Sequence, residues 1–282
     1  MEGTADAEGD RVLVPVEPVA AGRANAAPGW LTAPADAGFV VTLEVPVASL
    51  GCAIASRIWA PRGTPDDAPL PLLVVHDGPD YDSLASLTHY LGAGIAAGWL
   101  PRLRAALLSA GDRNSWYSAN VRYARALTEQ VIPALTGLVA TTARVGMGTS
   151  LGALAMLHAH CRRPGTFGGL FLQSASFFVP RLDPQERRFR YYRRITAFTA
   201  ALEADGVPGV PVPVSLTCGS IEENIANNRL MLSLLRSAGY PAMLHEVRAA
   251  HNFTAWRDAL HPWLTELLQQ VCGKGREEAD DI

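Results

Sequence analysis

The sequence predicts an α/β fold, with a mostly parallel central sheet and helices on both of its faces. Short runs rich in β-branched residues alternate along the chain with longer segments of helical spacing, which is the order that βαβ units produce. The chain has 282 residues, of which 49% are hydrophobic and 18% are charged. A domain of that size and composition buries a sizeable core. No internal repeat interrupts the alternation.

Eight strands and six helices are expected, and the first two strands form a hairpin. The expected strands span residues 40–45, 53–59, 71–76, 104–109, 144–147, 169–173, 212–218 and 242–247. The expected helices span residues 86–97, 119–136, 151–162, 192–204, 225–238 and 256–271. Functional groups of such sheets gather beyond the carboxyl ends of the strands. The residues that follow each strand are therefore the candidates for a site.

The two ends of the chain differ in composition from the middle. Residues 1–36 are rich in Ala, Gly, Pro and Asp and predict a flexible N-terminal arm. Residues 37–272 form the predicted α/β domain, and residues 273–282 predict a polar tail. The acidic start lacks the basic and apolar regions of a signal peptide, and no apolar run is long enough to span a bilayer. We expect a cytoplasmic protein without a membrane partner.

Charge and cysteine spacing exclude several function classes. The formal net charge is −3, which gives no reason to expect a nucleic-acid partner. The four cysteines are far apart, and His158 and His160 face different ways on a predicted helix. We therefore expect no metal site and no cofactor, and a small-molecule substrate as the partner.

A nucleophile motif follows the predicted strand 144–147. Gly148-Thr149-Ser150-Leu151-Gly152 is the only G-x-S-x-G sequence in the chain, and it lies between a strand and a helix. A serine on this sharp turn projects its hydroxyl above the sheet, and the glycines let the strand and helix approach closely. An ordinary glycine-rich turn is the alternative. A dinucleotide site is a weaker one, because Gly146, Gly148 and Gly152 have the wrong spacing.

A serine hydroxyl needs a base, and His251 is the histidine best placed to serve. In α/β-hydrolases the acid and then the histidine follow the serine along the chain. The other six histidines precede Ser150, lie on its own helix, or lie inside a predicted strand or helix. His251 occupies the loop between the last strand and the last helix. The alternative is a polar loop residue without a catalytic role.

The acid that orients this histidine should follow a strand between Ser150 and His251. Only Glu222 and Glu223 come directly after a strongly β-like run, residues 212–218. We favour Glu222, and Glu223 remains the alternative.

When a serine attacks an ester, negative charge develops on the carbonyl oxygen of the substrate, and two backbone N–H groups are expected to stabilise this oxyanion. Leu151, the residue after the nucleophile, supplies one. The second is expected from the loop after strand 71–76, from Gly78 or Asp80, because Pro79 has no N–H. The alternative for Gly78-Pro79 is a simple turn.

Three segments together resemble a known family. They are His76-Asp77-Gly78, the motif at 148–152 followed by Leu172-Gln173-Ser174-Ala175-Ser176, and residues 218–222 leading to His251 and Trp256. They resemble the esterase D group of α/β-hydrolases, and within it the catalytic domain of enterochelin esterases. The resemblance implies an α/β-hydrolase fold with Ser150 as nucleophile, Glu222 as acid and His251 as base. Relatives usually carry a non-proline residue after Asp-Gly, where this chain has Pro79.

Side chains on the carboxyl-end loops are expected to face the substrate. Asp77, Arg113 and Trp116 are the candidates, although an Asp112–Arg113 pair that braces the loop is an equal alternative. Residues 187–194 form the densest positive run in the chain. The run suits an anionic or catecholate substrate, but a solvated helix start explains it better.

The sequence therefore predicts a serine esterase that acts on a siderophore-type or other anionic or aromatic ester. An acyltransferase with the same three residues is the alternative, because both enzymes share the acyl-enzyme. A non-catalytic binding protein on the same fold is less favoured, because Ser150, Glu222 and His251 are all present.

Overall fold

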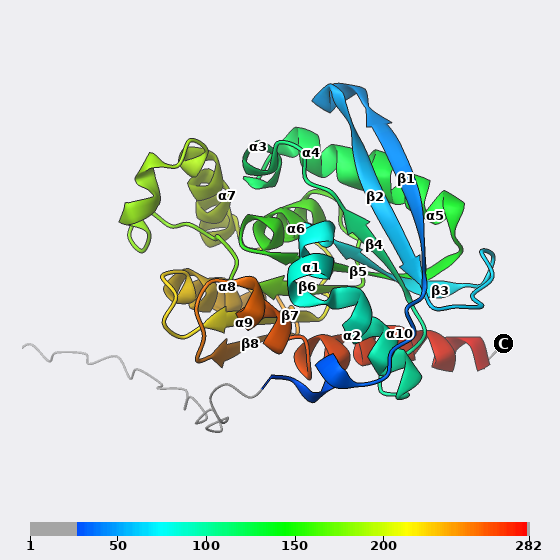
Figure 1. The fold of residues 1–282 in the computed structure, drawn as a ribbon. Helices are drawn as coiled ribbons and strands as arrows, with labels where there is room; N and C mark the ends of the chain where they lie inside the picture. The colour runs from blue at the N-terminus through cyan, green and yellow to red at the C-terminus, as the bar shows by residue number, and fades with distance from the viewer. Residues whose placement is uncertain (1–26, 281–282) are drawn as a thin grey trace, which may run out of the picture.

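The computed structural model describes residues 27–280 and contains one eight-stranded sheet (Figure 1). The strands lie in the order β1-β2-β4-β3-β5-β6-β7-β8. β1 pairs antiparallel with β2, and β2 pairs antiparallel with β4, whereas all later pairings are parallel. The strands are β1 (Phe39–Val47), β2 (Cys52–Ala60), β3 (Leu70–Val75), β4 (Arg104–Leu108), β5 (Thr141–Thr149), β6 (Gly169–Gln173), β7 (Val214–Gly219) and β8 (Ala242–Val247).

Helices cover both faces of the sheet, which confirms the predicted fold class (Figure 1). One face packs on α4 (Val121–Ala126), α5 (Ile132–Leu138), α6 (Leu151–Arg162), α7 (Tyr192–Asp205) and α8 (Ile225–Ser237). The other packs on α1 (Gly78–Ala85), α2 (Leu87–Ala96), α9 (Phe253–Asp258) and α10 (Trp263–Asp280). A short helix, α3 (Arg113–Tyr117), follows β4. Along β3, Leu72 and Val74 face the first layer and Leu73 and Val75 face the second, as the period of a strand requires.

All eight predicted strands are present, and β5 is longer than expected. The prediction ended this strand at residue 147, but pairing with β6 continues it to Thr149. The order of the strands also creates a switch point, because the chain leaves β3 toward β4 on one side and returns to β5 on the other. Ligands of open α/β sheets bind at such a point, outside the carboxyl ends of the strands. Asp77 follows β3 there, and Ser150 follows β5.

Besides the unexpected α3, the helices differ from the prediction in three places. α1 was not expected, but Pro79 fits its first turn because that position needs no N–H donor. The helix expected at 119–136 begins after Asn120, whose side chain caps Arg122 and Tyr123, and it contains a π-helical turn at Leu127–Val131. The helix expected at 256–271 is divided into α9 and α10 around Pro262, which cannot continue a helix.

The predicted ends of the domain only partly overlap the described residues. Residues 1–26 of the predicted arm lie outside them. Further along the arm, Trp30 is buried in a short 3₁₀ helix (Gly29–Thr32), with its ring edge-on to Tyr90 of α2. The predicted polar tail begins inside α10, which continues to Asp280. None of the helices within residues 27–280 combines the length and apolar character needed to cross a bilayer.

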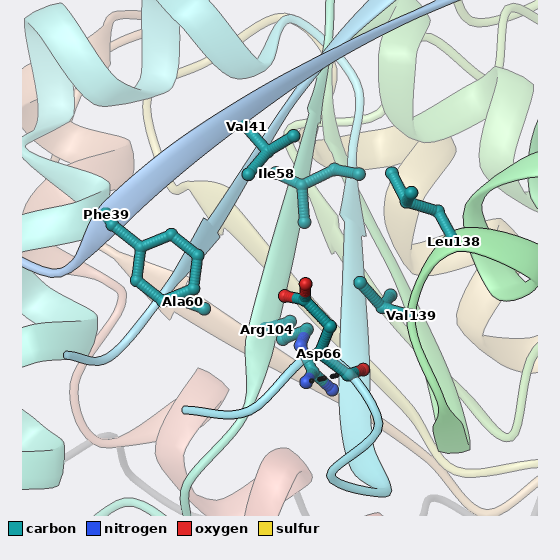
Figure 2. Close-up of a pocket in the computed structure, with 8 residues that line it drawn as sticks. All are labelled: Phe39, Val41, Ile58, Ala60, Asp66, Arg104, Leu138 and Val139. Carbon is teal, nitrogen blue, oxygen red and sulfur yellow. Dashed lines mark hydrogen bonds between the residues drawn. The ribbon is translucent and has the colours of Figure 1, made fainter. Parts of the chain in front are cut away.

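The amino ends of the parallel strands carry a separate small cavity of about 50 Å³ (Figure 2). Arg104, at the start of β4, is buried there and donates hydrogen bonds to the backbone oxygens of Pro65, Asp66, Ala68 and Ala140. These bonds tie the β2–β3 and α5–β5 loops together. The cavity is at the opposite end of the sheet from Ser150, so we assign Arg104 a structural role.

Candidate active site

Ser150 occupies the sharp turn between β5 and α6. Its backbone has φ 54° and ψ −122°, a conformation that a non-glycine residue rarely adopts. A Cβ atom on Gly148 would lie 2.5 Å from the carbonyl carbon of Gly152. A Cβ on Gly152 would lie 3.2 Å from the Cβ of His76. The two glycines thus allow β5, α6 and the end of β3 to meet beneath a strained serine, the geometry of a nucleophile elbow.

Glu222 and His251 come together from the loops after β7 and β8. The Nδ1 of His251 lies 2.7 Å from the Oε2 of Glu222. A carboxylate only accepts, so Nδ1 donates, and the neutral imidazole keeps Nε2 as a proton acceptor. The side chain of Glu222 is 2% exposed, whereas Glu223 is exposed to solvent. The structure thus pairs His251 with the favoured glutamate.

The second oxygen of Glu222 is also fully engaged. Its Oε1 accepts hydrogen bonds of 2.8 Å from the N–H of Gly219 and from the hydroxyl of Ser174. The indole Nε1 of Trp256 donates to the same Ser174 hydroxyl at 2.9 Å, and the Trp256 ring lies edge-on to His251. Sequence reasoning missed the positioning roles of Ser174 and Trp256. The only signal for them was their presence in the segments that carried the family resemblance.

Two neighbouring cavities each contain both Ser150 and His251. The Phe178 cavity, of about 180 Å³, is lined by Ser150, Leu151, Ser176, Phe178, Glu186, Phe189, Glu223, Asn224 and His251. The Arg113 cavity, of about 260 Å³, is lined by Asp77, Asp80, Arg113, Thr149, Ser150, His251, Phe253 and Trp256. The hydroxyl of Ser150 makes a 3.1 Å hydrogen bond with that of Ser176. The candidate nucleophile therefore lies where the two cavities meet, one with apolar side chains such as Phe178 and the other with charged side chains such as Arg113.

The expected oxyanion donors lie at the first turns of two helices. Leu151 begins α6, and Gly78 and Asp80 belong to the first turn of α1. Within residues 27–280, the N–H groups of these three residues have no hydrogen-bond acceptor. Gly78 packs against β4, where a Cβ would lie 2.3 Å from the Cα of Leu107, whereas Asp80 lines the Arg113 cavity. This placement favours Asp80 over Gly78 as the second donor, and the assignment stays a prediction.

A family model named Esterase and described as "Putative esterase" matches residues 47–267. The chain belongs to this esterase family. The family supports hydrolysis of a carboxylic ester, and it confirms the resemblance inferred from the sequence. A search of curated proteins found no match.

Solved structures show the same fold. The enterochelin esterase from Shigella flexneri has a TM-score of 0.73 at 21% identity, over 87% of this chain and 62% of the other. The ferric enterobactin esterase from Salmonella typhimurium has a TM-score of 0.73 at 22% identity, over 88% of this chain and 62% of the other. A ferulic acid esterase has a TM-score of 0.67 at 16% identity, over 82% and 98% of the two chains. This esterase thus spans less than two thirds of the enterochelin esterases, and the likeness establishes the fold.

Of the three side chains expected to face the substrate, Asp77 and Arg113 line a cavity with Ser150. They form a two-pronged ion pair in which Arg113 Nε and Nη2 donate to both oxygens of Asp77 at 2.8–3.0 Å. Asp112 does not pair with Arg113, because it caps α3 by accepting from the N–H of Ser115. The Asp112–Arg113 brace considered from the sequence is therefore wrong, and Asp77 is the partner of Arg113.

Trp116 is a correction to the prediction. The sequence placed it on an open loop, but residues 113–117 form α3, which turns the indole into the core. The ring stacks on Tyr123 at 5.5 Å and lines a different cavity, beside Leu50 and Asn120. Trp116 thus lines neither the Phe178 cavity nor the Arg113 cavity.

The arginines of residues 187–194 do not line the two cavities beside Ser150 either. Arg187, Arg188 and Arg190 are exposed. Arg194 donates to the backbone oxygens of Ser115 and Ser118 and lies over the ring of Tyr191. The segment instead contributes Phe189 to the Phe178 cavity, and Glu186, the residue just before the segment, lines the same cavity. Neither cavity therefore has the positively charged wall that would suit an anionic ester. Arg113 is the one arginine that lines either cavity, and its charge is paired with Asp77.

Buried histidines elsewhere have structural surroundings. His76 donates from Nδ1 to the oxygen of Gly152 at 2.8 Å, and its Nε2 accepts from the hydroxyl of Tyr123 at 2.8 Å. Burial lowers the pKa of His76 to about 3, so the ring is neutral at physiological pH. Burial also lowers the pKa values of His158 and His245 to about 4. His251 differs from these three because it is 40% exposed and faces a carboxylate.

Proposed function

We propose that this chain is a serine esterase that hydrolyses a carboxylic ester through an acyl-enzyme. Ser150 is the nucleophile, His251 the general base and Glu222 the acid that orients it. One observation carries the proposal: the 2.7 Å Glu222–His251 contact lies beside a strained serine that shares both of its cavities with His251. Family membership supports the ester bond as the target.

The geometry suggests how each step proceeds. The Nε2 of His251 takes the proton of Ser150 as the Ser150 oxygen attacks the ester carbonyl. The N–H of Leu151, together with that of Asp80 or Gly78, stabilises the negative charge that develops on the carbonyl oxygen. The intermediate collapses, and His251 returns the proton to the departing alcohol. Water then attacks the acyl-enzyme by the same route, and Ser150 regains its proton.

Ser176 holds the hydroxyl of Ser150 in the free enzyme. Catalytic hydrogen bonds are often loose before substrate binds, and they tighten in the reacting complex. The Ser150 hydroxyl therefore turns from Ser176 toward His251 when an ester fills the cavity.

Replacement of Ser150 tests the proposal. Ser150→Ala should lower hydrolysis of 4-nitrophenyl butyrate by at least about 10³-fold and abolish labelling by a fluorophosphonate, with an unchanged circular dichroism spectrum. Ser233→Ala, an exposed serine on α8, is the matched control and should retain both. Near-normal turnover in folded Ser150→Ala would refute the assignment. An alcohol added to the assay distinguishes hydrolysis from acyl transfer, because transfer yields a new ester.

A further inference from the structure

The Phe178 cavity has an unusual combination of walls beside the nucleophile. Leu151, Phe178 and Phe189 supply apolar surface, and the last two rings lie edge to face at 6.4 Å. Glu186 and Glu223 supply two carboxylates. No lysine or arginine lines the cavity, so the two carboxylates give its walls a net negative charge while the His251 imidazole is neutral.

Neither carboxylate has a cationic partner within residues 27–280. The ion pairs nearby are complete without them, since Arg181 pairs with Glu203 and Arg229 pairs with Glu246. The pKa of Glu186 is raised by partial burial first and then by the negative charges of Glu223 and Asp183, and the nearby His251 opposes this rise. A half-buried carboxylate with a second carboxylate beside it is stabilised by a positive charge brought into the cavity.

The aromatic walls indicate which kind of positive charge fits. Aromatic rings attract organic cations through the negative face of the π-system, and such rings with acidic neighbours recognise alkylated ammonium groups. Phe178 also stacks on Tyr192, and Phe189 lies near Tyr191, so aromatic side chains continue behind the wall. The rings and the carboxylates are independent features: the carboxylates favour a cation of any kind, and the rings favour an organic ammonium group over a small hydrated metal ion.

We propose that the Phe178 cavity selects esters that carry an alkylammonium or quaternary ammonium group, with Glu186 and Glu223 as the specificity-determining residues. The inference rests on the proposed function, because Ser150 and His251 open onto the same cavity. It replaces the anionic ester suggested by residues 187–194, whose arginines lie outside that cavity.

Matched esters at pH 8 test the charge preference. The acyl series compares 4-nitrophenyl esters of 4-(trimethylammonio)butanoate, neutral 5,5-dimethylhexanoate and anionic glutarate. The alcohol series compares butyrylcholine with its neutral isostere 3,3-dimethylbutyl butyrate. In at least one series the cationic ester should exceed its isostere about tenfold in kcat/KM at low salt, and the preference should shrink at 0.5 M salt.

Variants then assign the preference to the two glutamates. The cationic-to-neutral ratio is taken within each protein, so a general loss of activity cancels. Glu186→Gln and Glu223→Gln should each lower that ratio about threefold, and the double variant should bring it near one. Glu44→Gln removes the same charge from an exposed site on β1, at the far edge of the sheet, and should leave the ratio unchanged.

The outcomes separate this inference from the proposed function. Equal or lower kcat/KM for the cationic esters in both series, with hydrolysis that still depends on Ser150, would overturn only the charge preference. A preference that survives in the double variant would also overturn it. No Ser150-dependent hydrolysis of any ester would instead overturn the proposed function.

Discussion

Two loops at the carboxyl edge of the sheet each bury a carboxylate against a basic side chain, but they are built for different tasks. Asp77 after β3 and Glu222 after β7 have side chains that are both 2% exposed. Asp77 holds the guanidinium group of Arg113, which has donors only, and Glu222 holds the imidazole of His251, whose Nε2 can accept a proton. With equal burial of the two carboxylates, the first pair forms a rigid brace, and we propose that the second takes part in proton transfer.

The surroundings of the two carboxylates follow the same division. Each hydrogen bond that the Asp77 carboxylate accepts comes from the one guanidinium group of Arg113, so the two side chains satisfy each other. Glu222 divides its oxygens between His251 and a fixed frame formed by Gly219 and Ser174. That frame fixes the carboxylate and leaves the imidazole open to the cavities beside Ser150.

The largest expected effect follows from removing the charge of Glu222. Glu222→Gln should lower kcat for a neutral 4-nitrophenyl ester by about 10²–10⁴-fold, because the amide no longer holds His251 in the right tautomer. Steady-state kinetics measure the loss, and Glu223→Gln is the neighbouring control, with an expected loss below about tenfold. A larger loss in Glu223→Gln would transfer the role to that residue. A small loss in both would leave a serine–histidine dyad.

Removing the charge of Asp77 should act on stability. Asp77→Asn leaves Arg113 partly buried without its partner, at a cost of about 2 kcal/mol, since solvent reaches part of the guanidinium. Urea unfolding measures the change, and the double variant Asp77→Asn/Arg113→Met should regain part of it. Unchanged stability together with a collapse of turnover would instead place Asp77 in the chemistry and erase the contrast between the loops.

A third expected effect concerns the pH dependence contributed by His76, next to Asp77. Its pKa is about 3 in the fold, against about 6.5 when unfolded, so the unfolded chain binds an extra proton between these values. The free energy of unfolding therefore keeps its full value above about pH 6.5. Below that pH it decreases by about 1.4 kcal/mol per pH unit until the folded pKa is reached. His158 and His245 act in the same direction.

Urea unfolding between pH 7 and pH 4.5 tests the role of His76. His76→Asn should have a lower free energy of unfolding at every pH. As the pH falls, however, its free energy of unfolding should decrease less steeply than that of the wild type, by about 1.4 kcal/mol per pH unit, because one fewer proton is taken up on unfolding. An unchanged slope would show that the His76 ring already takes up its proton in the folded enzyme.

Local patterns in the chain were sufficient for much of this architecture. The alternation of strands and helices and the strand–turn–helix setting of Ser150 depend on neighbouring residues, and all eight strands are present where expected. The order of loops along the chain then reduced the candidates to His251 and to Glu222 or Glu223. The prediction of the fold succeeded because backbone periodicity and glycine spacing are written locally, whereas the catalytic roles of these residues stay a prediction.

Only the tertiary structure decided how the side chains are partnered. Arg113 reaches back to Asp77 rather than to adjacent Asp112, and α3 turns Trp116 into the core. Glu222 is buried beside His251 while Glu223 faces the Phe178 cavity with Glu186. Each outcome depends on segments dozens of residues apart that meet at the edge of the sheet. The direction of a side chain and the charge of a cavity wall are set by that packing, which no local pattern encodes.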